Sequence, residues 1–151
     1  MSLIGIAIVA VIFIAVAACI FADKNTNKNF LAQFYAKHQA KDKYADFTIT
    51  KNRELIYNLS SGSVAGFKVW KLDDIGRISF SDLKIVTRQF SIQDRNGKTM
   101  KGQYLTPSKK QLKEYKFSSF DVRGGQNSDD IIKLIRRNAP HITFTVNGNA
   151  V

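Results

Sequence analysis

The chain has 151 residues and a formal net charge of +11, a length that suits one domain of ordinary size rather than two. Cys19 is its single cysteine, which excludes an intramolecular disulfide, so the sequence does not depend on an oxidising compartment. Every charged residue lies after Ala22, which divides the chain into an apolar segment and a basic domain.

The first predicted element is a membrane-spanning helix over residues 1–22. No charged residue occurs from Ser2 to Ala22, and about 20 helical residues at ~1.5 Å each cover the thickness of a hydrocarbon core. Lysines follow this segment from Lys24 onward and none precedes it. The positive-inside rule then places the N-terminus outside and the following domain in the cytoplasm. We therefore expect a single-pass protein of the cell inner (plasma) membrane.

Two alternatives remain open for this segment. A cleaved signal peptide begins with positive charge, which is missing here. The letters VAAC at residues 16–19 resemble a lipobox, and lipidation of Cys19 after cleavage would give an exported lipoprotein. That protein would act in the envelope, in a surface-exclusion or superinfection-exclusion role.

A connector over residues 23–45 follows. The stretch DKNTNKN is polar and without pattern, and it predicts a linker. Beyond it, Phe30, Leu31, Phe34, Tyr35 and His38 recur at helical spacing. We expect a short amphipathic helix over 28–42 whose apolar face packs on the domain or on the headgroup layer.

The remaining residues, 46–151, are predicted to form a β-rich domain. DFTIT and ELIYNL are short strands with the turn KNR between them, and FKVWKL is a further strand. The Asn-Gly turn in DRNGK predicts that strands around 84–94 and 98–105 are antiparallel neighbours. TPSKKQLKEY is expected to be a loop or a helical turn.

The end of the chain holds the clearest predicted helix, SDDIIKLIRRN, which Asn127 or Ser128 can cap. YKFSSFDVR before it and HITFTV after it are predicted strands. The expected fold class is α+β: an N-terminal transmembrane helix, then a small antiparallel β-barrel or curled sheet of about six or seven strands closed by the C-terminal helix.

This order resembles the bacterial pleckstrin-homology-like (PH-like) fold, within an uncharacterised family of single-pass membrane proteins. The resemblance lies in FTITKNRELIYNL, in FKVWKLDDIGRISFSDLKI and in the helix SDDIIKLIRR, and it covers residues 46–146. It implies a binding or scaffolding module for lipid headgroups or protein segments, and it implies no reaction.

The residues themselves predict no catalytic centre, no metal site and no cofactor. The two histidines are far apart in the sequence, and the pairs Asp73-Asp74 and Asp129-Asp130 suit a turn and a helix start. The expected function is a membrane-anchored, non-enzymatic interaction or scaffolding module on the cytoplasmic face. Its expected partners are membrane lipid and an unidentified protein, and the pattern does not favour nucleic acid. The candidate contacts with anionic lipid are Lys24, Lys28, Lys37, Lys41, Lys43, Lys109, Lys110, Lys113, Arg136 and Arg137.

Overall fold

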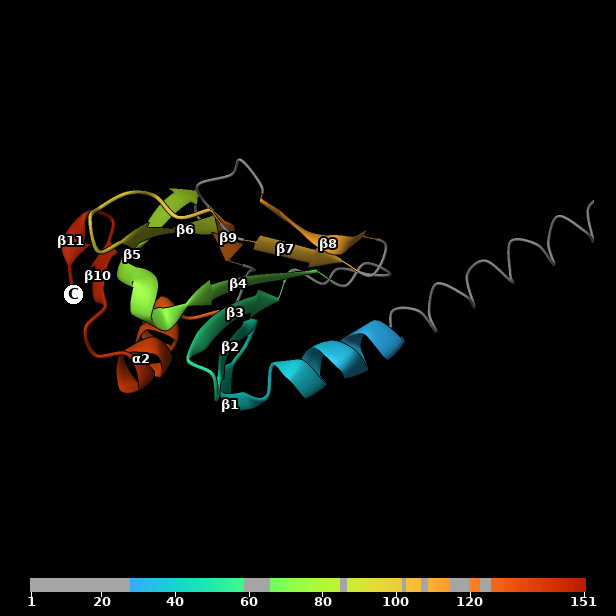
Figure 1. The fold of residues 1–151 in the computed structure, drawn as a ribbon. Helices are drawn as coiled ribbons and strands as arrows, with labels where there is room; N and C mark the ends of the chain where they lie inside the picture. Colours follow the sequence, from blue (N-terminus) through green and yellow to red (C-terminus); the bar gives the residue numbers. More distant parts are fainter. Residues whose placement is uncertain are drawn as a thin grey trace, which may run out of the picture.

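A computed structural model shows two stacked β-sheets with a helix on the outside and a helix at one end (Figure 1). The residues that it describes are 28–58, 66–84, 87–101, 103–106, 109–114, 120–122 and 126–151.

The first sheet has six strands in the order β1-β2-β3-β4-β7-β8, all antiparallel. Two tight turns build its first half, with Ala45 at φ 51° between β1 and β2 and Arg53 at φ 58° between β2 and β3. The predicted strands on either side of KNR are thereby confirmed. The bounds are β1 Ala40–Tyr44, β2 Phe47–Thr50, β3 Glu54–Asn58, β4 Phe67–Lys71, β7 Gln103–Thr106 and β8 Lys109–Glu114.

The second sheet has five strands in the order β11-β10-β5-β6-β9. The chain enters it through a short 3-10 helix, η1, at Leu72–Asp74. Strands β5 and β10 pair in parallel, and the other pairs are antiparallel. The bounds are β5 Ile75–Lys84, β6 Thr87–Asp94, β9 Phe120–Val122, β10 Thr143–Val146 and β11 Asn149–Ala150.

These sheets correct the predicted fold class. The described strands form two open sheets rather than one small barrel or curled sheet, because η1 moves the chain from the first sheet to the second. The predicted hairpin after β6 is confirmed at its start and wrong beyond it. The turn forms, with Gly97 N–H donating to the Asp94 carbonyl at 3.1 Å. Residues 98–100 then pair antiparallel with the end of β6, through the bridge between Gln93 and Thr99 and through Asp94 N–H to the Lys98 carbonyl at 2.9 Å and Met100 N–H to the Ile92 carbonyl at 2.8 Å. Strand β7 pairs with β4 instead.

The membrane predictions are corrected as well. No helix within the described ranges is long and apolar enough to cross a membrane. The described part of the chain therefore gives no support to a single-pass protein of the inner membrane, and we withdraw that localisation. The predicted anchor, residues 1–22, and the candidate lipidation site Cys19 lie outside the described residues.

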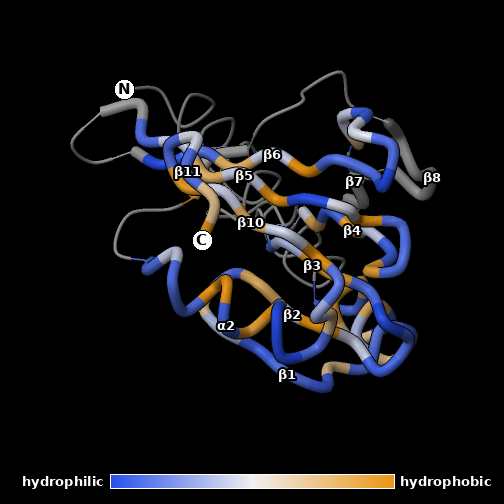
Figure 2. The backbone as a smooth tube through the Cα atoms, turned by 90° about the vertical axis from the view of Figure 1, so that its left-hand side faces the viewer, coloured by the Kyte–Doolittle hydropathy of each residue, from blue (hydrophilic) through white to orange (hydrophobic). Residues whose placement is uncertain are grey.

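The main core lies between the two sheets. It is formed by the side chains that point inward from the strands of both sheets. Hydrophobic and hydrophilic positions alternate along β5 and β6 (Figure 2), where Ile78, Phe80, Phe90 and Ile92 are buried. Phe90 is at the centre of an aromatic cluster. Its ring centroid lies 5.1 to 6.2 Å from those of Phe47, Tyr57, Trp70 and Phe80.

A second, smaller core lies on the outer face of the first sheet. Residues 28–37 are helical and cover this face, so the predicted amphipathic helix is shorter than 28–42 and gives way to β1 at Ala40. Phe34 is buried and stacks on Phe67 with ring centroids 4.2 Å apart. Ile56 completes the buried cluster.

The C-terminal helix α2, Ser128–Asn138, is confirmed where the sequence predicts it. Its buried residues Ile131, Ile132, Leu134 and Ile135 join the main core, and it contacts β1 and β2 (Figure 1). Asn127 caps it by accepting a hydrogen bond from Asp129 N–H at 2.9 Å.

Replacing Asn127 with alanine removes this cap. We expect Asn127→Ala to lower the free energy of unfolding by about 1 kcal/mol, whereas Asn127→Asp, which retains an acceptor, changes it little. Urea unfolding followed by circular dichroism measures the difference. Equal stability of Asn127→Ala and the unmodified chain would show that the cap is not needed.

Candidate functional site

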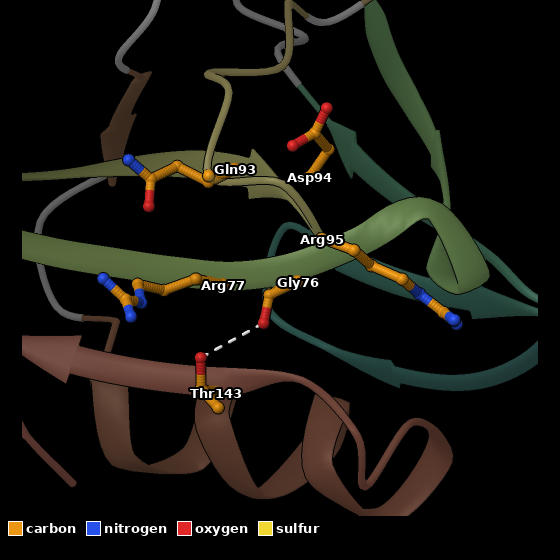
Figure 3. A pocket seen from close by; sticks show the side chains of 7 residues that line it. Gly76, Arg77, Gln93, Asp94, Arg95 and Thr143 are labelled. Carbon is orange, nitrogen blue, oxygen red and sulfur yellow. Dashed lines mark hydrogen bonds between the residues drawn. The ribbon is translucent and has the colours of Figure 1, made fainter.

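The candidate site is a surface pocket of about 190 Å³ where β5, β6 and β10 meet, here called the β5–β6 pocket (Figure 3). It is lined by Gly76, Arg77, Gln93, Asp94, Arg95, Gly97 and Thr143.

A β-bulge at Gly76 shapes the floor of the pocket. The register between β5 and β6 shifts between Ile75 and Arg77, which brings the two backbones close together. A Cβ atom on Gly76 would lie 2.5 Å from the Asp94 carbonyl oxygen. Glycine is therefore required at this position, and the bulge turns the following side chain, Arg77, to the outer face.

Strand register places three polar side chains in one row across the pocket. Thr143 on β10 is opposite Arg77 on β5, and Arg77 is opposite Gln93 on β6. Arg77 and Gln93 extend toward the same side in Figure 3. Thr143 Oγ1 donates to the Gly76 carbonyl at 3.1 Å. The row presents a guanidinium, an amide and a hydroxyl to solvent.

The side-chain partners of the other described arginines set them apart from the two arginines of the pocket. Four of the other arginines have partners: Arg53 with Asp73, Arg88 with Asp82, Arg137 with Asp42, and Arg136 with the Val151 carbonyl. Within the part of the chain that the structure describes, the side chains of Arg77 and Arg95 have neither a hydrogen bond nor an ion pair. Both line the β5–β6 pocket.

The two other charged residues that line the pocket, Arg95 and Asp94, do not face Arg77. Arg95 extends away from Arg77, toward the side of η1 (Figure 3), where its charge contributes to the lowered pKa of Asp73 after the larger effect of Arg53. Asp94 Oδ1 accepts hydrogen bonds from Asn96 N–H and Lys98 N–H, each at 2.9 Å, and so closes the turn. Arg77 is therefore the charge that the pocket leaves available.

Among the described residues, the predicted lipid contacts belong to elements at separate places in the fold. Exposed Lys41 and Lys43 lie on β1, and Lys109, Lys110 and Lys113 lie on β8. These strands are the two edges of the six-stranded sheet, about 24 Å apart along the sheet at ~4.8 Å per strand spacing. Lysine on an edge strand discourages pairing with another chain, which accounts for these positions without a ligand.

The other predicted contacts are on helices. Lys28 and Lys37 are exposed on the helix 28–37, and Lys24 lies outside the described residues. Arg136 and Arg137 are exposed at the end of α2 but are already engaged: Arg137 donates to Asp42 on β1, and Arg136 lies over the Phe144 ring at 5.4 Å. Contact of this set with anionic lipid stays a prediction.

One notable residue, the buried lysine Lys68, was not identified from the sequence. It lies on β4 and is 6% exposed, and desolvation lowers its pKa to about 8. The signal in the sequence is its alternation with Trp70, which places both side chains on the core side of the strand.

This lysine makes stability depend on alkaline pH. Between pH 8 and the ordinary lysine pKa of 10.5 the folded side chain is neutral and the unfolded one is charged. The unfolded state then binds more protons, so the free energy of unfolding rises with pH across this window. We expect Lys68→Met to abolish that rise in urea titrations at about pH 7.5 to 10.5. An unchanged rise in the variant would assign it to other groups.

Asp82 links the two hairpins of the second sheet, β5–β6 and β10–β11, through hydrogen bonds. Arg88 Nε donates to its carboxylate at 2.6 Å and Asn147 Nδ2 at 2.9 Å, and Arg88 Nη1 donates to Ser128 Oγ at the start of α2. These donors, Arg88 first, lower the pKa of Asp82 to about 2.

The Asp82 pKa predicts a loss of stability in acid. The folded-state pKa is below the ordinary value of 3.8, so the contribution is complete above about pH 4 and is lost as the pH falls toward 2. We expect the stability difference between the unmodified chain and Asp82→Asn to shrink over this range in denaturant titrations. A difference that stays constant down to about pH 2 would contradict the assignment.

One polar network joins a histidine, a carboxylate and a hydroxyl. His38 Nδ1 lies 2.8 Å from Glu54 Oε2, and Thr50 Oγ1 donates to the same oxygen at 3.0 Å. Thr50 is buried, and His38 stacks on Phe34. The network therefore fastens the end of the helix 28–37 to β3. Among the described residues, no three His, Cys, Asp or Glu side chains group as metal ligands.

Comparison of the chain with protein-family models, with curated proteins and with solved structures gives no match.

Proposed function

We propose that the chain is a non-enzymatic interaction module whose binding surface is the β5–β6 pocket and the adjoining outer face of the five-stranded sheet. The observation that carries the proposal is the pairing pattern: the two described arginines whose side chains have no hydrogen bond or ion pair line one concave site. An arginine whose side chain has no partner among the described residues retains donors for a planar, bidentate ligand.

The chemistry of the adjoining face supports binding rather than reaction. Side chains that alternate with the buried Ile78, Phe80, Phe90 and Ile92 are polar, and they include Ser79 and Ser91, which are directly opposite each other. Such a face offers hydrogen bonds without a nucleophile–base pair. The resemblance of residues 46–146 to the PH-like family implies the same class of function and is part of the proposal.

Site-specific photo-crosslinking in the native cell tests the function. A photo-crosslinking amino acid in place of Ser91, beside the pocket, is expected to give a discrete adduct. The same amino acid in place of Lys133, exposed on α2, serves as the matched control and is expected to give none. The adduct from position 91 should fall at least fivefold in Arg77→Ala. Equal adducts from both positions, or an adduct that does not depend on Arg77, would reject this surface.

A further inference from the structure

We propose that the β5–β6 pocket binds a carboxylate group, held by the Arg77 guanidinium and the Gln93 side-chain amide. This inference rests on the proposed function and specifies the chemistry of its ligand.

The first argument is geometric. Arg77 and Gln93 are directly opposite each other on neighbouring strands, where Cβ atoms are about 5 Å apart. Both side chains extend to the same side of the sheet (Figure 3). A guanidinium donates two parallel hydrogen bonds to a planar carboxylate, and the amide NH₂ beside it can supply a third.

The second argument is charge. The lining carries two positive groups, Arg77 and Arg95, and one negative group, Asp94. Its net charge of one positive unit matches a monoanion better than a dianionic phosphate. Since Arg95 extends away from Arg77 (Figure 3), only one positive charge lies beside Gln93, so a second negative charge on the ligand would have no partner.

The third argument is access. Arg77 is exposed, and the pocket volume of about 190 Å³ accommodates a carboxylate with a short carbon stem. The source of the group is either a small organic acid or an acidic side chain of a protein partner. The two sources share the recognition chemistry, and they differ in whether the carbon stem ends freely or continues into a polypeptide backbone.

The test is a titration of the full-length, isotopically labelled chain with sodium acetate. The measured quantities are the NMR chemical shifts of the backbone amides of Gly76 and Gly97 and of the side-chain amide of Gln93. We expect saturable shifts with a Kd on the order of 10 mM, as suits a bidentate guanidinium contact supplemented by one amide hydrogen bond. Sodium chloride at equal ionic strength should not reproduce them. A second arm compares the blocked peptides Gly-Glu-Gly and Gly-Gln-Gly: binding of the first alone points to an acidic side chain, and binding of acetate alone to a small acid.

Variants of the pocket define the assignment. Arg77→Ala should weaken acetate binding at least tenfold. Arg77→Lys keeps the charge but loses the planar pair of guanidinium donors, and it should weaken binding several-fold. Gln93→Glu places a carboxylate opposite Arg77 from within the chain and should abolish binding. Lys133→Ala, which removes one exposed charge from α2, should leave it unchanged.

Several outcomes would overturn the inference: equal shifts with chloride, tighter binding of inorganic phosphate than of acetate at about pH 7.5, where phosphate is largely dianionic, or unaltered acetate binding in Gln93→Glu. If acetate fails in any of these ways while crosslinking from position 91 still depends on Arg77, only the carboxylate assignment is wrong. Loss of both results rejects the interaction surface itself.

Discussion

Replacing Phe90 with alanine is expected to lower the free energy of unfolding by about 3–5 kcal/mol. Phe90 is 1% exposed and contacts four aromatic rings, which come from β2, β3, β4 and β5. The substitution opens a cavity that rigid neighbours on both sheets cannot fill, and it removes edge-to-face contacts in addition. This is a large share of the total stability of a domain of this size.

Urea unfolding of Phe90→Ala and of Phe90→Leu measures the effect. The leucine variant retains most of the volume, so we expect it to recover more than half of the loss. Arg77→Ala, on the outer face of the same sheet, should change stability by less than about 0.5 kcal/mol and separates a core effect from a surface one. A loss below about 1.5 kcal/mol in Phe90→Ala would show that the sheets repack around the gap.

Phe34→Ala is expected to detach the helix 28–37 from the first sheet. In proteins most of the stability of a helix comes from packing of its apolar face rather than from helix propensity. Its attachment depends on the stack of Phe34 on Phe67 and on the contact of His38 with Glu54. Loss of the buried ring should therefore expose Ile56 and Phe67 while the main core between the sheets remains folded.

Native-state hydrogen exchange distinguishes this local opening from global unfolding. In Phe34→Ala the amides of residues 32–37 should lose protection by two orders of magnitude or more, and those of β5 and β6 should keep theirs. Tyr35→Ala removes a neighbouring ring that is 37% exposed and should have a much smaller effect. Equal loss of protection in both regions would mean that the helix and the sheets unfold as one unit.

Local sequence patterns were sufficient to predict the elements whose turn, alternation or capping residues lie within or beside the element itself. Strands β2 and β3 alternate around a short turn, and α2 carries a cap, acidic residues at its start and basic residues at its end. Strand β8, KKQLKE, was missed because an edge strand needs no apolar alternation. The partner of β7 was wrong because the Asn-Gly signal fixes a turn but not the strand that follows it.

The candidate site could not be found from the sequence for a different reason. Arg77 differs from Arg53 or Arg88 in forming no ion pair with a described residue, and that depends on the register of β5 with β6 and β10. Conversely, the cations that the sequence grouped together are divided between two sheet edges and two helices. Clustering along the chain did not predict clustering on the surface.

The parallel pairing of β10 with β5 has a consequence for folding on the ribosome. Thr143 and Gly76, which join the two strands, are 67 positions apart. Strand β5 therefore emerges long before its partner is synthesised, and during that interval one of its edges is unpaired. We expect nascent chains halted before residue 140 to bind chaperones and to resist compaction, because contacts this distant in sequence form late and leave strand edges open to aggregation.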